Sequence, residues 1–212
     1  MPKEIDAIYN PSEQWRPVEE GTYPAHVSKL SIRENVNTKA GEAIVVNMEY
    51  KIAPEVEECF QQVFQMEGYE YVKDKDGNKI HLLDGDGSPS SVKCSHLKGR
   101  TYKDNGFFIF LNSSSGSKNA RYFEVLEELG IELETDKIDG KEVKKLVLIE
   151  ESDVIGKPVN VVLKREEYIT KATQHLPPSE QEKRSVFKVN TIKEWEGGKK
   201  VEAEELESDV PF

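Results

Sequence analysis

Two neighbouring segments alternate apolar and polar residues with the period of a β-strand, and they constrain the fold more than any other feature of the chain. The apolar positions of the first segment, residues 23–32, include Ala25, Val27, Leu30 and Ile32. Their alternation slips once, at Ser28–Lys29, which indicates a β-bulge within one long strand. The second segment, residues 42–52, is β-branched at its centre and follows a turn over residues 35–41. The sequence therefore predicts two long strands joined by a turn.

Shorter strand-like runs follow these two segments. Asp76-Gly77 is a hairpin signal between residues 69–73 and 79–83. The most aromatic part of the chain spans residues 99–111, and a loop rich in serine and glycine follows it over residues 112–119. We expect the remaining strands at residues 145–149, 157–163 and 185–195, with a proline-containing loop at residues 174–182.

One segment has the periodicity of a helix. In residues 120–130 the apolar side chains recur at helical spacing, at Tyr122, Val125, Leu126 and Leu129. Gly130 stands where a glycine commonly ends a helix, and Asn119 is a residue type that caps the start of one. The sequence therefore predicts a single helix between the earlier and the later strands.

The order of these elements predicts a mainly β fold. An OB-like five-stranded Greek-key barrel has this order, with one helix at residues 120–130 between its third and fourth strands and with added hairpins. Other small barrels with a helical insertion have the same order. We expect an N-terminal arm at residues 1–20, one domain at residues 21–195 and a disordered acidic tail at residues 196–212.

Several classes of protein are excluded by simple features of the sequence. No apolar run approaches the roughly 18 residues of a membrane helix, so we expect no membrane partner. The first residues contain no apolar stretch of the kind found in secretory signals. The two cysteines, Cys59 and Cys94, are most simply free thiols, and the expected location is cytoplasmic.

The net charge of −11 argues at first against binding to nucleic acid, but its distribution is uneven. Residues 121–153 carry five basic and 11 acidic side chains, and residues 196–212 carry two and six. Residues 154–195 carry eight basic and five acidic side chains. Residues 98–120 are also basic, with Asp104 as their single acid. An acidic chain of this kind can still present a basic surface.

Basic and aromatic residues interleave in both basic stretches. Binding to single-stranded nucleic acid requires cations for the phosphates and aromatic faces for the bases. The predicted DNA-binding residues are Arg100, Tyr102, Lys103, Phe107, Lys164, Arg165, Tyr168 and Lys171. Strand alternation would bury Phe108 and Phe110 and turn Phe107 to the other face of its strand.

Signals for a metal, a cofactor or catalysis are weak. Cys59, His81, Cys94 and His96 lack the paired spacings of structural zinc sites. Two Asp-Gly turns, at residues 74–78 and 84–88, lack the spacing of an EF-hand loop. No phosphate-binding loop or Ser/His/Asp set has a recognisable context. We therefore predict no enzyme activity, no metal and no cofactor.

The last residues combine acids with an apolar end. Five carboxylates between Glu202 and Asp209 precede Val210-Pro211-Phe212. A solvated tail that aids solubility is one interpretation. A terminal aromatic ring next to the chain's carboxylate also suits capture by a partner with an apolar pocket and a basic lip. The predicted docking tip comprises Asp209, Val210, Pro211 and Phe212.

This tip resembles the C-terminal tip of single-stranded DNA-binding proteins, with Val210 where isoleucine is common. The body resembles a family of bacteriophage single-stranded DNA-binding proteins in three places: Gly21-Thr22-Tyr23-Pro24-Ala25, residues 99–102, and Ile155-Gly156-Lys157-Pro158-Val159. The resemblance implies an OB-fold body that protects single strands during phage DNA replication, recombination and repair in the host cytoplasm. It also implies that the tail recruits replication or recombination proteins.

Two alternatives to DNA binding remain open at this stage: an interaction module and, with the least support, an enzyme with a barrel fold. A β-barrel interaction module or scaffold without DNA affinity would also explain the acidic net charge. The tail carboxylates could also occupy the basic groove when DNA is absent. The sequence leaves the oligomeric state open, a homo-oligomer included.

Overall fold

The computed structural model describes residues 18–67, 70–110, 116–138 and 140–207. Its strands are β1 (Gly21–Thr38), β2 (Gly41–Ile52), β3 (Phe60–Gln62), β4 (Met66–Glu67), β5 (Glu70–Tyr71), β6 (Ser91–Lys93), β7 (Thr101–Lys103), β8 (Phe107–Ile109), β9 (Thr135–Ile138), β10 (Lys141–Lys144), β11 (Pro158–Ile169) and β12 (Lys183–Glu194). Its helices are α1 (Ala120–Glu128), α2 (Glu151–Val154) and α3 (Ala203–Glu207), with 3₁₀ turns η2 (Pro54–Glu58), η3 (Ser95–Leu97) and η4 (Gly116–Asn119). The prediction of a mainly β chain is confirmed.

The main sheet has the strand order β12-β11-β1-β2-β7, and β8 also pairs with β2. Its ladders are antiparallel. Within the described residues the sheet is open, so the prediction of a closed barrel is wrong. A parallel bridge between Asp104 and Val189 brings the segment after β7 against β12 without extending into a ladder. The shortness of β7, which has three residues, limits this contact.

The predicted bulge in β1 is confirmed by a register shift between Val27 and Lys29. The predicted turn at residues 35–41 is much shorter than expected, because β1 continues to Thr38. A second register shift, between Arg33 and Val36, accommodates Asn35 at a φ of 55°. Asparagine tolerates this left-handed conformation better than most residues, so the strand passes through the polar segment and ends in a tight turn.

The predicted helix is confirmed as α1, which buries Tyr122, Val125 and Leu126. Gly130, at a φ of 63°, ends the helix: its N–H donates to Glu127 O at 2.8 Å, and the next N–H donates to Leu126 O at 2.9 Å. These two bonds form a Schellman motif. Asn119 makes no side-chain cap. Its amide instead bonds both backbone groups of Phe110, at 2.9 and 3.1 Å, and fixes the helix start to the end of β8.

The strand predicted at residues 145–149 is wrong. The pairing strands lie earlier, in the β9–β10 hairpin. Lys145 N–H still donates to Glu134 O beside β9, at 2.8 Å, but farther along the segment the backbone bonds a side chain of α1. Tyr122 Oη donates to Val147 O at 2.9 Å and accepts from the N–H of Ile149 at 3.3 Å.

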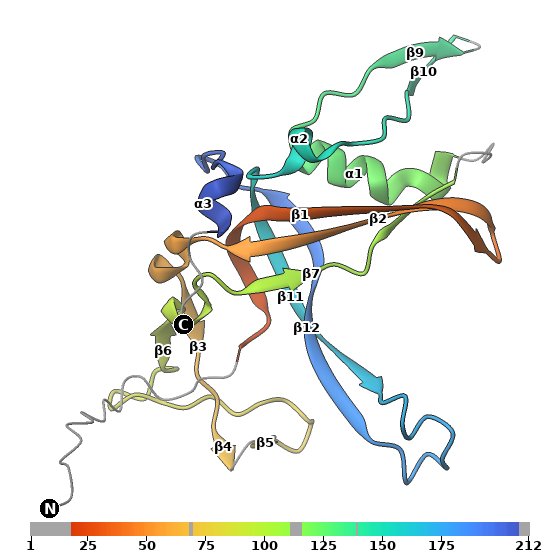
Figure 1. The fold of residues 1–212 in the computed structure, drawn as a ribbon. Coiled ribbons are helices and arrows are strands. Elements are labelled where there is room, and N and C mark those ends of the chain that lie inside the picture. The colour runs from red at the N-terminus through yellow and green to blue at the C-terminus, as the bar shows by residue number, and fades with distance from the viewer. Residues whose placement is uncertain (1–17, 68–69, 111–115, 139, 208–212) are drawn as a thin grey trace, which may run out of the picture.

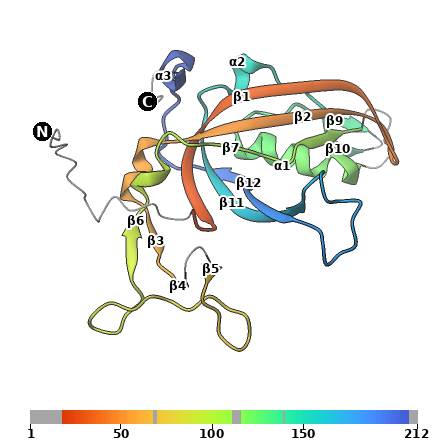
Figure 2. The same cartoon turned by 60° about the horizontal axis from the view of Figure 1, so that its bottom comes forward.

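A large insertion connects β2 to β7 and contains the small sheets β3–β6 and β4–β5. Figures 1 and 2 both show these sheets projecting away from the main sheet. The hairpin turn predicted at Asp76-Gly77 is confirmed, with Asp74 N–H donating to Asn78 O at 2.9 Å. The strands expected on either side shorten here to a bridge between Lys73 and Lys79.

The C-terminal segment is packed against the body as far as it is described, so the prediction of a disordered tail from residue 196 is wrong there. Val201 N–H donates to Gly156 O at 3.0 Å, and His26 Nε2 lies 3.0 Å from Lys199 O. Lys51 Nζ donates to Leu206 O at 2.5 Å. The predicted docking tip, residues 209–212, lies outside the described residues, as do residues 1–17 of the predicted arm. In the described part of the chain, no helix is long and apolar enough to span a bilayer.

Candidate nucleic-acid interface

Strand alternation defines a solvent-facing side of the main sheet, here called the outer face. On β2 the side chains directed into the core are Val46, Met48 and Tyr50. Glu49 therefore faces outward, and its register partner Lys103 on β7 shares that face. Val45 and its partner Phe108 on β8 lie on the same side of the sheet, where Val45 is covered, 2% exposed, and Phe108 is open to solvent.

A pair of aromatic rings, one exposed and one half-buried, lies at the β8 end of this face. The Phe108 side chain is 44% exposed, and its ring lies 6.3 Å from that of Phe110 with 19° between the ring planes. Lys118 Nζ lies 5.5 Å from the centre of the Phe110 ring. This arrangement provides stacking surfaces next to a cation, which is the combination that single-stranded nucleic acid requires.

Two sequence predictions about these phenylalanines are wrong. Phe107 is buried in the core, 8% exposed, and cannot stack on a base. Phe108 is exposed rather than buried, and Phe110 is half-buried beside it. The cause is the pairing of Phe107 with the core residue Val46, which fixes the phase of β8.

Polar contacts join the centre of the outer face across strands that are far apart in sequence. Lys103 Nζ lies 2.7 Å from Glu49 Oε1 on the neighbouring strand. Asn105, in the β7–β8 turn, donates to Glu166 Oε1 on β11 at 2.5 Å and accepts a hydrogen bond from Lys188 on β12. Lys188 Nζ also lies 3.4 Å from Glu166 Oε2. The β7–β8 turn is thereby fixed against the β11–β12 ribbon.

The β11–β12 ribbon continues the outer face beyond the start of β1, as Figure 1 shows. The last β1 pairing is Gly21 with Leu163, and the ribbon extends alone from there. Lys164 lies opposite Lys188, and Tyr168 lies opposite Arg184, so each of these two cross-strand pairs carries at least one cation. Tyr168 is 49% exposed. Arg184 Nε lies 2.8 Å from Glu182 Oε1.

A buried carboxylate holds the β7–β8 segment in place. Asp104 Oδ2 accepts from Met48 N–H at 3.1 Å, and Asp104 Oδ1 accepts from Gly106 N–H at 2.9 Å. Burial raises the pKa of Asp104 to about 6, against the opposing effect of these hydrogen bonds. Gly106, at a φ of 81°, allows the turn that leads into Phe107.

The structure brings some predicted residues together and separates others. Lys103, Lys164 and Tyr168 share the outer face. Tyr102 packs half-buried against the core, where burial raises its pKa and Arg100 bonds its hydroxyl. Arg165 faces the opposite side of the ribbon from Lys164. Lys171 is exposed in the loop after β11. The predicted residues therefore do not line one common groove.

Four residues of the interface were not among the sequence predictions: Phe108, Phe110, Lys118 and Lys188. The phase of β8 exposes Phe108, the register of β12 places Lys188, and the turn η4 brings Lys118 to the Phe110 ring. None of these placements can be read from local alternation. Arg184 is similar, because only its pairing with Tyr168 places it on the face.

Comparison with protein-family models, with curated proteins and with solved structures finds no match for this chain. Within the described residues, no three His, Cys, Asp or Glu side chains are grouped in a way that could hold a metal ion.

Proposed function

We propose that this protein binds single-stranded DNA on its outer face, with little dependence on sequence. The observation that carries the proposal is the exposed Phe108 ring, stacked beside the half-buried Phe110, at one end of a face that continues into the cross-strand pair Lys164–Lys188. Rings stack on bases of any identity, and lysines contact the phosphates between them. Two acids of this face, Glu49 and Glu166, are each paired with a lysine, which reduces their repulsion of phosphate.

We further propose that the connectivity is OB-like. β1, β2 and the β7–β8 pair would be the first three strands, α1 the helix that follows, and β11 and β12 the last two. The Asp104–Val189 bridge has the parallel direction that joins the third and fifth strands in that arrangement. OB-folds bind oligonucleotides over their second and third strands and the adjoining loops. The same region of this chain carries the Phe108–Phe110 pair.

The biological role follows the resemblance in sequence. The protein would coat and protect single strands during phage DNA replication, recombination or repair in the host cytoplasm, as a non-enzymatic protein without a cofactor. The tip at residues 209–212 would recruit partner proteins. The second candidate is a scaffold or interaction module without DNA affinity, and the net charge of −11 favours it.

A binding assay separates the two candidates. Fluorescence anisotropy of labelled oligo-dT is measured with the native chain and with the double variant Phe108→Ala/Phe110→Ala. Leu83→Ala is the matched control, because Leu83 is 56% exposed and lies in the insertion. The DNA-binding proposal predicts that the double variant weakens binding about tenfold or more and that the control does not. Absence of binding by the native chain at low salt would favour the scaffold.

A further inference from the structure

We propose a second subsite for an unpaired base, in the cleft between the start of β1 and the β2–β7 insertion. This inference rests on the proposed function and extends it. The cleft has a volume of about 580 Å³, and its lining includes Glu19, Thr22, Phe60, Phe64, Lys79 and His81. Such a volume lies within the usual range for small-molecule pockets, and a nucleobase belongs to that class of ligand.

Aromatic rings form one side of the cleft. The rings of Phe64 and His81 lie 4.7 Å apart, tilted by 32°. Tyr71 meets Phe64 edge-on at 6.1 Å. Phe60 is 62% exposed, the highest value among the large apolar side chains of the described residues. An exposed ring beside a packed aromatic cluster offers a face on which a planar ligand can stack.

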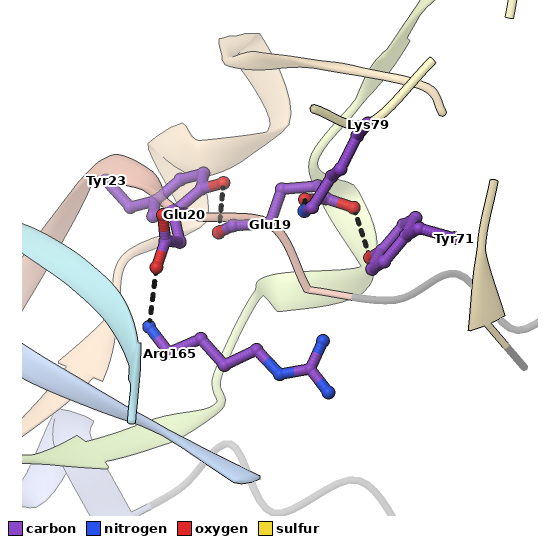
Figure 3. Close-up of polar contacts among 6 residues, drawn as sticks. All are labelled: Glu19, Glu20, Tyr23, Tyr71, Lys79 and Arg165. Atoms are coloured by element: carbon purple, nitrogen blue, oxygen red, sulfur yellow. Dashed lines mark hydrogen bonds and ion pairs between the residues drawn. The ribbon is translucent and has the colours of Figure 1, made fainter. Parts of the chain in front are cut away.

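An ion pair between the buried Glu19 and the partly exposed Lys79 holds Tyr71 in place, as Figure 3 shows. Glu19 is 6% exposed; its Oε2 lies 2.6 Å from Lys79 Nζ, and its Oε1 accepts from Tyr71 Oη at 2.5 Å. The Lys79 ammonium also lies 4.0 Å from the centre of the Tyr71 ring and 4.8 Å from that of Phe64. Burial, followed by the bond to Glu19, raises the pKa of Tyr71, so its hydroxyl stays a donor. The aromatic wall is therefore preorganised.

The charge balance of the cleft favours a base over a phosphate. The Lys79 charge is offset by Glu19 at hydrogen-bond distance. The lining also carries the Glu20 carboxylate, whose negative charge repels a phosphate. Its neutral polar groups include the exposed amide of Gln62 and the amide oxygen of Asn78, whose Nδ2 donates to Asp74 Oδ2 at 3.2 Å. Amides can bond the edge of a base, which carries both donors and acceptors.

Arg165 connects this cleft to the outer face. Its neighbour Lys164 lies on the outer face, and Arg165 points to the opposite side of the ribbon. The Arg165 N–H donates to Glu20 Oε1 at 3.0 Å, which fixes the ribbon against the start of β1. Its side chain extends on the side of the cluster where Tyr71 lies (Figure 3), and its charge opposes the rise in the pKa of Tyr71 that burial and Glu19 cause. A DNA strand that runs from Lys164 on the outer face to the cleft would therefore pass Arg165 first.

The test combines oligonucleotide length with mapping of contacts. Anisotropy is measured for Phe60→Ala over oligo-dT lengths from about 6 to 25 nucleotides, because each OB-type body covers roughly 4–16. Leu83→Ala is again the control. Loss of an exposed ring leaves the fold intact, which a thermal melt verifies. We expect Phe60→Ala to weaken binding about tenfold for the long oligonucleotides and to leave the shortest unchanged.

Photocrosslinking of an oligonucleotide carrying 5-iododeoxyuridine gives an independent readout. We expect adducts on Phe60, Phe64 or Tyr71 with long oligonucleotides, in addition to adducts on Phe108 or Phe110. Unchanged affinity of Phe60→Ala at every length, with crosslinks confined to the outer face, would overturn the second subsite and leave the proposed function standing. If the native chain binds no oligonucleotide, both proposals fail.

Discussion

The Asp104 carboxylate accepts a hydrogen bond from the backbone N–H of Met48 at 3.1 Å, and this contact joins the β7–β8 turn to the centre of β2. The same oxygen lies 3.4 Å from the Tyr50 hydroxyl in the core. The next residue, Asn105, lies on the surface and contacts Glu166 and Lys188. The geometry of the outer face therefore depends on a carboxylate beneath it.

This buried carboxylate predicts a specific pH dependence of stability. The pKa of Asp104 is raised from 3.8 to about 6, so the folded chain binds more protons than the unfolded chain between these values. The contribution of Asp104 to the free energy of unfolding therefore falls as pH rises from about 4 to 6. The free energy of unfolding of Asp104→Asn, measured in urea, should lack this pH-dependent contribution. At pH 7 it should be about 1–3 kcal/mol lower than that of the native chain, because the amide N–H₂ of asparagine would face a backbone N–H donor.

Asp76→Asn is the control for the Asp104 variant, since Asp76 is an exposed turn residue. The account is wrong if both variants keep the same pH profile as the native chain.

The close approach of Gly156 to Val201 leads to a prediction about how the C-terminal segment is held. A Cβ at this position would lie 1.9 Å from Val201 O, and the φ of Gly156 is +79°. Gly156→Ala should therefore release the segment, with a cost of roughly 2–4 kcal/mol for the combined clash and strain. Limited proteolysis should then cut within residues 196–207 faster than in the native chain.

Gly140→Ala is the control that separates the backbone strain of a positive φ from the clash with Val201. Gly140 has a φ of +76°, and a Cβ at this position would have no described atom within 4 Å. This variant should cost about 1 kcal/mol or less and should leave the C-terminal segment protected. Equal protease sensitivity of the two variants would show that the contact with Val201 does not hold the segment.

The carboxylates of the acidic tail should compete with DNA at low salt. Lys51, which bonds Leu206 O, pairs with Thr101 on β7, so the described chain ends close to the strands of the outer face. Removing residues 202–212, and with them five side-chain carboxylates, should tighten oligo-dT binding about severalfold at low ionic strength, with little change at high ionic strength, because the competition is electrostatic. Equal affinities of the two chains at low salt would remove this role for the tail.

The features that sequence predicted well are local. The bulge at Ser28–Lys29, the end of α1 at Gly130 and the turn at Asp76-Gly77 each follow from a phase slip or a single residue type. The alternation of residues 107–110 indicates that they form two faces of a strand. It does not indicate which of the two faces is buried. That choice depends on the pairing of Phe107 with Val46, which lies 61 positions earlier in the numbering.

The remaining parts of the site depend on contacts between distant segments. The cleft combines Glu19, Phe64 and Lys79, and nothing in the spacing of these residues links them. The C-terminal segment reads as a solvated acidic tail from its composition. It packs because Gly156 leaves room for Val201 and because Lys51 bonds the carbonyl group of Leu206 in α3.

The most direct test of the central claim is the salt dependence of oligo-dT binding by the full-length chain and by Lys164→Gln/Lys188→Gln. The account predicts that the native affinity falls linearly on logarithmic axes as salt rises. It also predicts that the double variant reduces the magnitude of this slope by about 1.4, because each of the two lost phosphate contacts contributes about 0.7. A native chain that does not bind at low salt, or a double variant with the native slope, would contradict binding of single strands on the outer face.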